Sequence, residues 1–324
     1  MEILQNINNC PDALKGAALA IGNFDGVHRG HQAVLRAALE AAEAAGVPAG
    51  VMTFEPHPRA FFQPDVPLFR LTPGPLKARL FAALGLDMAL IQPFDADLAS
   101  RSAVDFARDF LVEALRVSHV ITGSDFHFGK GRDGNPEVLR AFGQAHGFDV
   151  TIVAPQAGEG GVFSSTGIRE HLRRGDPRGA AEKLGYWWRV IGEVIGGDQR
   201  GHGLGFPTAN IAVPEGFALK HGIYAVRVRT GEGKYDGAAY FGTRPSFDSG
   251  APVIETFLFD FHGDLYGQEI EIEVIGFLRD DETFASADAL IEQMRIDCQK
   301  ARGVLSEIAA DDPMQKFELG RALA

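Results

Sequence analysis

Short apolar runs alternate with amphipathic segments along roughly the first half of the chain. The apolar runs are typical of buried strands and cover residues 18–22, 50–54, 88–91, 119–123 and 148–154. Between them, apolar residues recur every three or four positions, which predicts helices over residues 31–45, 76–85, 103–115 and 136–147. Strands separated by helices form βαβ units, so this half predicts an α/β fold with a parallel sheet covered by helices on both faces.

The pattern changes near residue 184, shortly after the basic segment RRGDPRG. Runs rich in β-branched and aromatic residues, separated by glycine-rich turns, predict strands over residues 187–197, 222–230, 234–242, 253–261 and 269–278. A helical pattern returns at residues 286–300. Strands followed by one helix predict an antiparallel barrel or compact sheet with a helix packed on it. We therefore expect domains over residues 1–184 and 185–308, with a helical extension over residues 309–324.

Composition narrows the classes of partner. The chain has 324 residues, and its formal net charge of -12 disfavours a protein that grips nucleic acid through a basic face. No apolar run approaches the length of a membrane span, and the first residues lack the pattern of a signal peptide. Cys10 and Cys298 are too few for a disulfide framework. We expect a cytoplasmic protein, with neither membrane nor nucleic acid as partner. Any anionic ligand should bind to a local group of residues rather than to a broad basic face.

One candidate for such a group is the segment GNFDGVHRGHQ, residues 22–32, directly after the first predicted strand. Its glycines permit close approach of the backbone to a ligand, and the following helix directs free N–H groups at it. His28 and His31, three residues apart, could stabilise charge developing on a phosphoryl group. Two alternatives stay open: a plain turn, and a metal site completed by His57, His127 or Asp25, although no known metal spacing is present.

This segment also carries a resemblance. The HRGH core is similar to the HxGH signature of the nucleotidyltransferase superfamily, and IGNFDGVHRGHQ resembles the N-terminal module of prokaryotic bifunctional riboflavin kinase/FAD synthetases. TFEPHP at 53–58, GSDFHFGKG at 123–131 and SSTGIRE at 164–170 match the same module in order. The resemblance implies a Rossmann-like nucleotidyltransferase fold and an FMN adenylyltransferase, in which the FMN phosphate attacks the α-phosphorus of ATP, pyrophosphate leaves and FAD forms.

The resemblance also implies roles for individual residues of this module. Stabilisation of the transition state and of the leaving phosphates falls to His28, His31 and Arg169. Binding of ATP and its phosphates falls to Gly22, Phe24, Gly30, Ser165 and Thr166. The flavin side would be lined by Asp125, Phe54, His57, Phe62 and Phe128. For Phe54 and Phe62, ordinary core packing remains the alternative.

A second glycine-rich segment, GDQRGHGLGFPTANI, spans residues 197–211. Thr208 and Asn210 are two residues apart, so in an extended segment their side chains point to the same face. Their oxygen atoms could both reach one Mg²⁺, which prefers oxygen ligands and commonly binds nucleotide phosphates as well. A polar edge strand preceded by Pro207 is the alternative.

This segment resembles the riboflavin kinase module of the same family through its PTAN signature. HGIYAV at 221–226, YFGTRPSF at 240–247, IETFLFDF at 254–261 and DLYGQEIEI at 264–272 agree with it. The resemblance implies a riboflavin kinase-like barrel, with Glu255 as general base for the ribityl hydroxyl and Thr208 and Asn210 at the metal. It also implies a phosphate flap of Gly201, Gly203 and Gly205, and a flavin contact from Arg244. The chain departs from the common pattern at His202, Gly203, Tyr240 and Phe241.

Together the two modules predict an enzyme that phosphorylates riboflavin to FMN in its C-terminal domain and adenylylates FMN to FAD in its N-terminal domain. ATP is the co-substrate and Mg²⁺ the expected metal at both sites, and apo-flavoproteins are conceivable acceptors of the FAD. One rival interpretation is a monofunctional FAD synthetase whose barrel only binds flavin. A second is a non-enzymatic, flavin- or nucleotide-responsive regulator, which the acidic charge disfavours. The sequence leaves the oligomeric state open.

Overall fold

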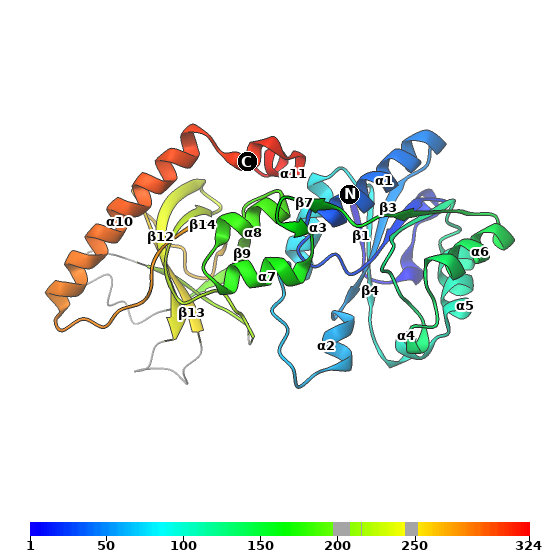
Figure 1. Cartoon of the computed structure of the whole chain (residues 1–324), viewed down its shortest axis with the longest axis horizontal. Coiled ribbons are helices and arrows are strands. Elements are labelled where there is room, and N and C mark those ends of the chain that lie inside the picture. The colour runs from blue at the N-terminus through cyan, green and yellow to red at the C-terminus, as the bar shows by residue number, and fades with distance from the viewer. Residues whose placement is uncertain (197–207, 215, 244–251) are drawn as a thin grey trace. The chain divides into compact units, whose positions relative to one another are not determined.

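The structure is a computed structural model that describes residues 1–196, 208–214, 216–243 and 252–324 (Figure 1). The chain divides into two compact units, Met1–Ser165 and Thr166–Ala322, the last two residues aside. This division assigns the helices between residues 165 and 184 to the second unit; the predicted limits 1–184, 185–308 and 309–324 stay predictions. Within the described residues, no helix combines the length and apolar character that crossing a membrane requires.

The first unit contains a six-stranded parallel sheet in the order β1-β4-β3-β2-β5-β6. Its strands are β1 (Glu2–Leu4), β2 (Ala18–Ile21), β3 (Ala49–Glu55), β4 (Met88–Pro93), β5 (His119–Gly123) and β6 (Asp149–Val153). The chain leaves β2 to build β3 and β4 on one side, then returns to build β5 and β6 on the other. This reversal is the switch point at which open parallel sheets bind ligands, and the loop after β2 lies there. Among the six strands of this sheet, the short edge strand β1 is the one that the sequence pattern does not predict.

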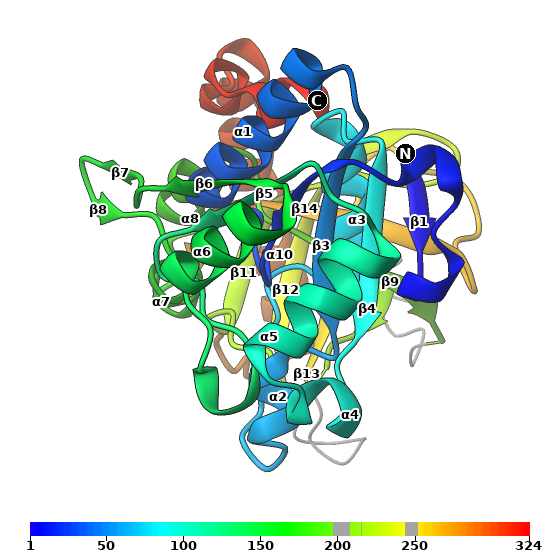
Figure 2. The ribbon, with the colours of Figure 1, turned by 90° about the vertical axis from the view of Figure 1, so that its right-hand side faces the viewer.

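Helices cover both faces of this sheet, as predicted (Figure 2). They are α1 (Arg29–Ala45), α2 (Pro58–Phe62), α3 (Gly74–Ala83), α4 (Ala96–Ser100), α5 (Ala103–Phe106), the π-helical segment η3 (Ala107–Ala114) and α6 (Pro136–His146). Three short 3₁₀ turns, η1 (Ile7–Asn9), η2 (Asp12–Leu14) and η4 (Lys130–Arg132), and a hairpin of β7 (Ala157–Gly158) and β8 (Gly161–Val162) complete the unit.

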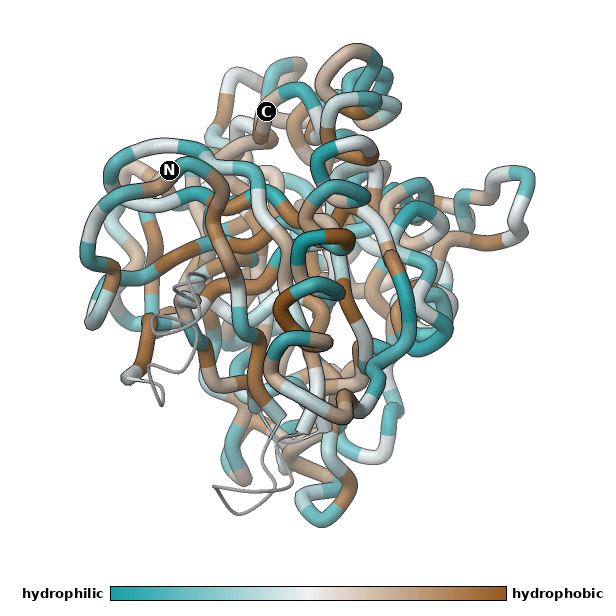
Figure 3. The backbone as a smooth tube through the Cα atoms, turned by 90° about the vertical axis from the view of Figure 1, so that its left-hand side faces the viewer, coloured by the Kyte–Doolittle hydropathy of each residue, from teal (hydrophilic) through white to brown (hydrophobic). Residues whose placement is uncertain are grey.

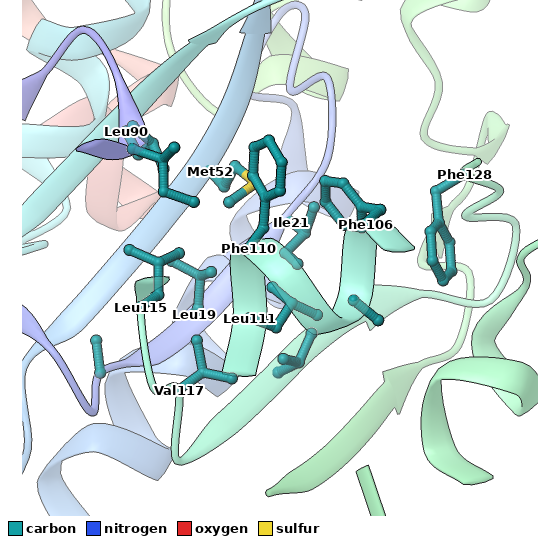
Figure 4. Close-up of a cluster of buried hydrophobic side chains, with 14 of the residues drawn as sticks. Leu19, Ile21, Met52, Leu90, Phe106, Phe110, Leu111, Leu115, Val117 and Phe128 are labelled. Atoms are coloured by element: carbon teal, nitrogen blue, oxygen red, sulfur yellow. The ribbon is translucent and has the colours of Figure 1, made fainter. Parts of the chain in front are cut away.

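The alternation of side chains along β2 decides which helix lies on which face. Leu19 and Ile21 belong to a buried cluster with Phe106, Phe110 and Leu111 from α5 and η3 (Figure 4). The intervening alanines of β2 are also fully buried but lie outside this cluster, on the face that α1 contacts. The predicted helix over residues 103–115 is present, but it continues past Phe106 with π-helical geometry.

The second unit is built on a closed antiparallel barrel in the order β10-β13-β12-β11-β14-β9. Its strands are β9 (Arg189–Ile195), β10 (Ala209–Ala212), β11 (Gly222–Arg229), β12 (Lys234–Thr243), β13 (Pro252–Leu258) and β14 (Glu269–Arg279). Its helices are α7 (Ser165–Arg173, beginning at the last residue of the first unit), α8 (Pro177–Leu184), α10 (Ala287–Ala310), η5 (Pro313–Lys316) and α11 (Glu318–Ala322). The barrel and its C-terminal helix confirm the predicted fold class.

Helix α10 packs on the outside of this barrel. Ala225 and Ala238 from neighbouring strands form a buried cluster with Ala301, Leu305 and Ile308 of the helix. Figure 3 shows hydrophobic and hydrophilic residues interspersed along the backbone. Burial alternates from residue to residue along β13, as expected when a strand buries one face. The helix runs ten residues past the predicted end at residue 300, because Leu305 and Ile308 continue its buried stripe.

Candidate functional site

The loop after β2 is held in one conformation by buried hydrogen bonds. The Asp25 carboxylate, 2% exposed, accepts from the backbone N–H groups of Leu71 (3.0 Å) and Thr72 (3.0 Å). The backbone N–H of Gly26 donates to the Thr72 hydroxyl at 2.8 Å. These contacts use the Asp25 oxygens inside the protein, so Asp25 acts as a brace for the loop.

In the part of the chain that the structure describes, no group of three or more His, Cys, Asp and Glu side chains could hold a metal ion.

His28 is the N-cap of α1. Its Nδ1 accepts from the backbone N–H of His31 at 3.2 Å, so the neutral ring carries its proton on Nε2. The helix therefore begins at Arg29, two residues before the predicted start, because an imidazole takes the role that Ser or Asp usually fills. The two imidazole rings stack, with centroids 3.6 Å apart and planes 16° apart.

Both imidazoles are neutral near pH 7. Burial lowers the pKa of His28 to about 4, against the opposing effect of the Asp25 carboxylate. Burial also lowers the pKa of His31 well below its ordinary value, and His28 and the Lys77 ammonium act in the same direction. A neutral imidazole at a helix N-terminus can donate a hydrogen bond to a phosphate oxygen without bringing a proton that must be removed.

The segment before α7 lies against this loop. The Ser165 hydroxyl donates to the backbone oxygen of Asp25 at 2.7 Å, and the Arg29 guanidinium lies 4.3 Å from the centre of the Phe163 ring. At Gly30, a Cβ would come within 3.1 Å of the His28 ring and 3.6 Å of the Phe163 carbonyl oxygen. The fold thus brings together the HRGH segment and the start of the SSTGIRE segment. That the two segments form one phosphate site stays a prediction.

The other residues expected at the phosphates have different positions. Phe24 is buried, and its ring lies edge-on to His31 at 5.3 Å; Gly22 lies beside it, where a Cβ would meet that ring at 3.2 Å. Thr166 and Arg169 lie in α7, where Arg169 is 8% exposed. They belong to the second unit, and their part at the phosphates stays a prediction.

The candidate flavin residues Phe54, His57 and Phe62 follow one another at the carboxyl end of β3 and in α2. Phe54 is buried and lies edge-on to Phe94, with ring centroids 6.0 Å apart. Phe62 is 63% exposed and also lies edge-on to Phe94, at 5.7 Å. His57 caps α2 by accepting from the Arg59 backbone N–H. The exposed Phe62 ring, supported by the partly buried Phe94, gives a flat ring system a surface on which to pack.

Asp125 and Phe128 lie beyond β5. Asp125 is exposed, while its backbone oxygen contacts the His127 Nδ1 at 2.9 Å. Phe128 is 9% exposed, stacks on Phe126 at 5.3 Å and packs against Phe106 within the hydrophobic cluster (Figure 4). Its ring therefore contributes to core packing. A contact between the ring edge and a flavin stays a prediction.

Strand register assembles the candidate site of the second unit. Asn210 of β10 lies directly opposite Glu255 of β13, which lies directly opposite Tyr240 of β12. Directly opposed residues share a face, with Cβ atoms about 4.5–5.5 Å apart. Thr208, two residues before Asn210, lies just outside β10 and is partly exposed. The register thus sets the Asn210 amide opposite the Glu255 carboxylate, and oxygen groups of these kinds, with the hydroxyl of the nearby Thr208, are of the type that suits Mg²⁺. Gly201, Gly203, Gly205, Arg244 and the departure at His202 lie outside the described residues.

Two family models and several full-length relatives match the chain. The FAD synthetase model matches residues 10–167 and the riboflavin kinase model matches residues 184–305. A bifunctional riboflavin kinase/FMN adenylyltransferase of Escherichia coli (strain K12) is 38% identical over 305 residues, covering 93% of this chain and 97% of the relative. One from Listeria monocytogenes is 37% identical over 293 residues, covering 90% and 93%.

The chain belongs to the bifunctional riboflavin kinase/FMN adenylyltransferase family. A crystal structure described as a macrolide-efflux protein from Streptococcus pneumoniae has the same fold, with a TM-score of 0.80 and 28% identity over 93% of this chain and 98% of that one. Both family modules are present in one chain, which favours the bifunctional interpretation over the monofunctional rival.

Sequence reasoning missed the charged groups that support the first site. Lys77, Glu55 and Arg70 form a buried and half-buried cluster next to the loop after β2. A lysine within a predicted helix looks like an ordinary surface residue, so periodicity gave no signal for Lys77. The only available hint was Glu55, which lies inside the TFEPHP segment.

Proposed function

We propose that this chain makes FAD from riboflavin in two ATP-dependent steps, one in each unit. In the second unit, the ribityl 5′-hydroxyl attacks the γ-phosphorus of ATP, Glu255 accepts the hydroxyl proton, and FMN and ADP form. In the first unit, an FMN phosphate oxygen attacks the α-phosphorus of ATP and pyrophosphate leaves. No base is needed there, because the attacking phosphate is already an anion.

The observation that carries the proposal for the second unit is the register of β10 and β13. It sets Glu255 opposite Asn210, where a carboxylate can accept a proton beside oxygen groups suited to a metal. Thr208 and Asn210 would hold Mg²⁺, which when bound neutralises charge on the nucleotide phosphates. Gly201, Gly203, Gly205 and Arg244 keep their proposed roles at the phosphates and flavin.

For the first unit, the proposal is supported by the stacked, neutral imidazoles of His28 and His31 at the start of α1. Their N–H groups and the helix N-terminus supply donors for the phosphates of ATP. We assign Gly22, Phe24, Gly30, Ser165, Thr166 and Arg169 to the same phosphate site, and Asp125, Phe54, His57, Phe62 and Phe128 to the flavin side. Mg²⁺ at this site, a cytoplasmic location and delivery of FAD to apo-flavoproteins stay predictions.

One experiment tests both activities. The full chain is incubated with riboflavin, ATP and Mg²⁺, and FMN and FAD are followed by chromatography; both must form. His31→Ala should abolish FAD formation and leave FMN formation intact. Glu255→Gln should abolish FMN formation from riboflavin and leave FAD formation from supplied FMN intact.

Matched controls separate these effects from general damage. His146→Ala changes an exposed histidine of α6, and Glu193→Gln an exposed glutamate of a barrel strand, so both should keep both activities. Loss of both activities in a folded His31→Ala or Glu255→Gln chain would show that the two sites are not divided as proposed.

A further inference from the structure

Lys77 is buried beside the first-unit site, in a position that lysine rarely occupies. It lies in α3 and is 1% exposed. A buried ammonium is costly unless it is paired and hydrogen-bonded, so its retention calls for a physical reason. Lys77 lies outside the sequence segments that the resemblance links to nucleotide or flavin binding.

The Lys77 ammonium uses all three of its donors on partners around the loop. Nζ donates to the Asn23 backbone oxygen (3.0 Å), the Thr53 hydroxyl (3.2 Å) and the Glu55 carboxylate (3.2 Å). Arg70 binds the same carboxylate with two further hydrogen bonds, at 2.6 and 3.0 Å. Two cations therefore share the Glu55 carboxylate, and the Asp25 carboxylate also acts on Lys77.

The Asn23 carbonyl connects this cluster to the histidines. It accepts from Lys77 and also from the Thr53 hydroxyl, at 3.1 Å. The next residue, Phe24, has φ of 50°, in the left-handed region that a phenylalanine adopts only when its surroundings enforce it. The Phe24 ring lies edge-on to His31 at 5.3 Å. The two hydrogen bonds to Asn23 thus fix the turn that holds the ring against His31.

The charge of Lys77 also acts on His31, in addition to the hydrogen bonds that hold the turn. The titratable and charged groups that lower the pKa of His31 are His28 from the loop and Lys77 from α3, after the larger effect of burial. The His31 Nδ1 is buried and has no hydrogen-bond partner among the residues that the structure describes. Burial keeps His31 neutral, with a donor available for phosphate, and the nearby Lys77 ammonium further disfavours the imidazolium.

We propose that Lys77 is a positioning residue for adenylyl transfer, which acts by fixing the Asn23–Phe24 turn that supports His31. The inference rests on the proposed role of His31 in that reaction.

Lys77→Met is the main test because it keeps the length of the side chain and removes the ammonium. Glu55 keeps Arg70 and Asn23 keeps Thr53, so the remaining polar groups stay paired. In the full chain we expect kcat for FAD formation from FMN to fall at least 10-fold, with KM for FMN within 2-fold. FMN formation from riboflavin in the second unit should be unchanged. Lys15→Met, at a partly exposed lysine of the same unit that pairs with Asp12, should leave both rates unchanged.

A titration of His31 by NMR separates positioning from a purely structural role. Lys77→Met should raise the pKa of His31, although burial still holds it below the ordinary value. Wild-type FAD formation in Lys77→Met, or a lost rate with an unchanged His31 titration, would overturn the proposal. The titration reports on the surroundings of His31 and does not depend on activity. It therefore still tests the effect of Lys77 on His31 if His31→Ala retains FAD formation and the proposed role of His31 fails.

Thr53→Val is a milder second variant, which decides the matter if Lys77→Met does not fold. It keeps the volume and removes one partner of Lys77 and one donor to Asn23. We expect a 3- to 10-fold fall in FAD formation, again without a change in KM for FMN. A folded Thr53→Val chain with the wild-type rate would overturn the proposal.

Discussion

The buried His28 makes the stability of the first unit depend on pH in a defined direction. Its folded-state pKa is about 4, whereas the ordinary value is 6.5, because burial disfavours the imidazolium. Protonation of Nδ1 would also break its hydrogen bond from the His31 backbone N–H. The unfolded chain therefore binds the proton more tightly. The stability that neutral His28 contributes is present in full above pH 6.5 and is lost as the pH falls towards 4.

The magnitude follows from the two pKa values. The whole difference corresponds to about 3 kcal/mol, of which about 2 kcal/mol should be lost between pH 7 and pH 5. His31, whose pKa is also lowered, adds a loss of the same sign. His28→Asn should remove the His28 contribution and keep the helix cap, because asparagine is a favoured N-cap residue.

The assay must report on the first unit by itself. Trp187 and Trp188 both belong to the second unit, so tryptophan fluorescence follows that unit. Hydrogen exchange of peptides from β2 and β3 in increasing urea measures the opening of the first unit at pH 7 and pH 5. Carboxylates that titrate in this range affect both proteins equally. If His28→Asn lost as much stability on acidification as the wild type, within about 0.5 kcal/mol, the reasoning would be refuted.

Three further predictions concern the brace, the C-terminal extension and the metal. Asp25→Ala should cost the first unit about 3–6 kcal/mol, since two buried backbone N–H groups, of Leu71 and Thr72, lose a charged acceptor; a loss below about 1 kcal/mol in the same exchange assay would contradict this. Asp312→Ala should destabilise the second unit by about 2–4 kcal/mol, measured by fluorescence in urea, because the Trp187 indole N–H donates to that carboxylate at 3.0 Å. An unchanged midpoint would mean that the extension is not anchored there. EDTA should stop FMN formation and added Mg²⁺ should restore it; FMN formation that persists in excess chelator would refute the assigned metal.

Much of the fold could be predicted because each periodicity is local. The apolar run over residues 18–22 must be buried on both faces in any fold, and glycine and proline mark where such runs end. The edge strand β1 escaped prediction because it is short and Ile3 is 47% exposed, so no buried pattern distinguishes it. The helix predicted to end at residue 300 runs on because Leu305 and Ile308 are buried against the barrel, a contact that the local sequence does not reveal.

The sequence by itself determined the fold class and the candidate chemistry of this protein: the histidines after the first predicted strand, the PTAN segment and the glutamate of a later strand, each recognisable within a few residues. Tertiary structure decided how those groups are held. It made His28 a helix cap, turned Asp25 into a brace, set Asn210 opposite Glu255 and buried Lys77 against the Asn23 carbonyl. The reason is physical: residue type is a local property, whereas burial, protonation and strand register depend on groups that are distant in the sequence and meet only in the folded chain.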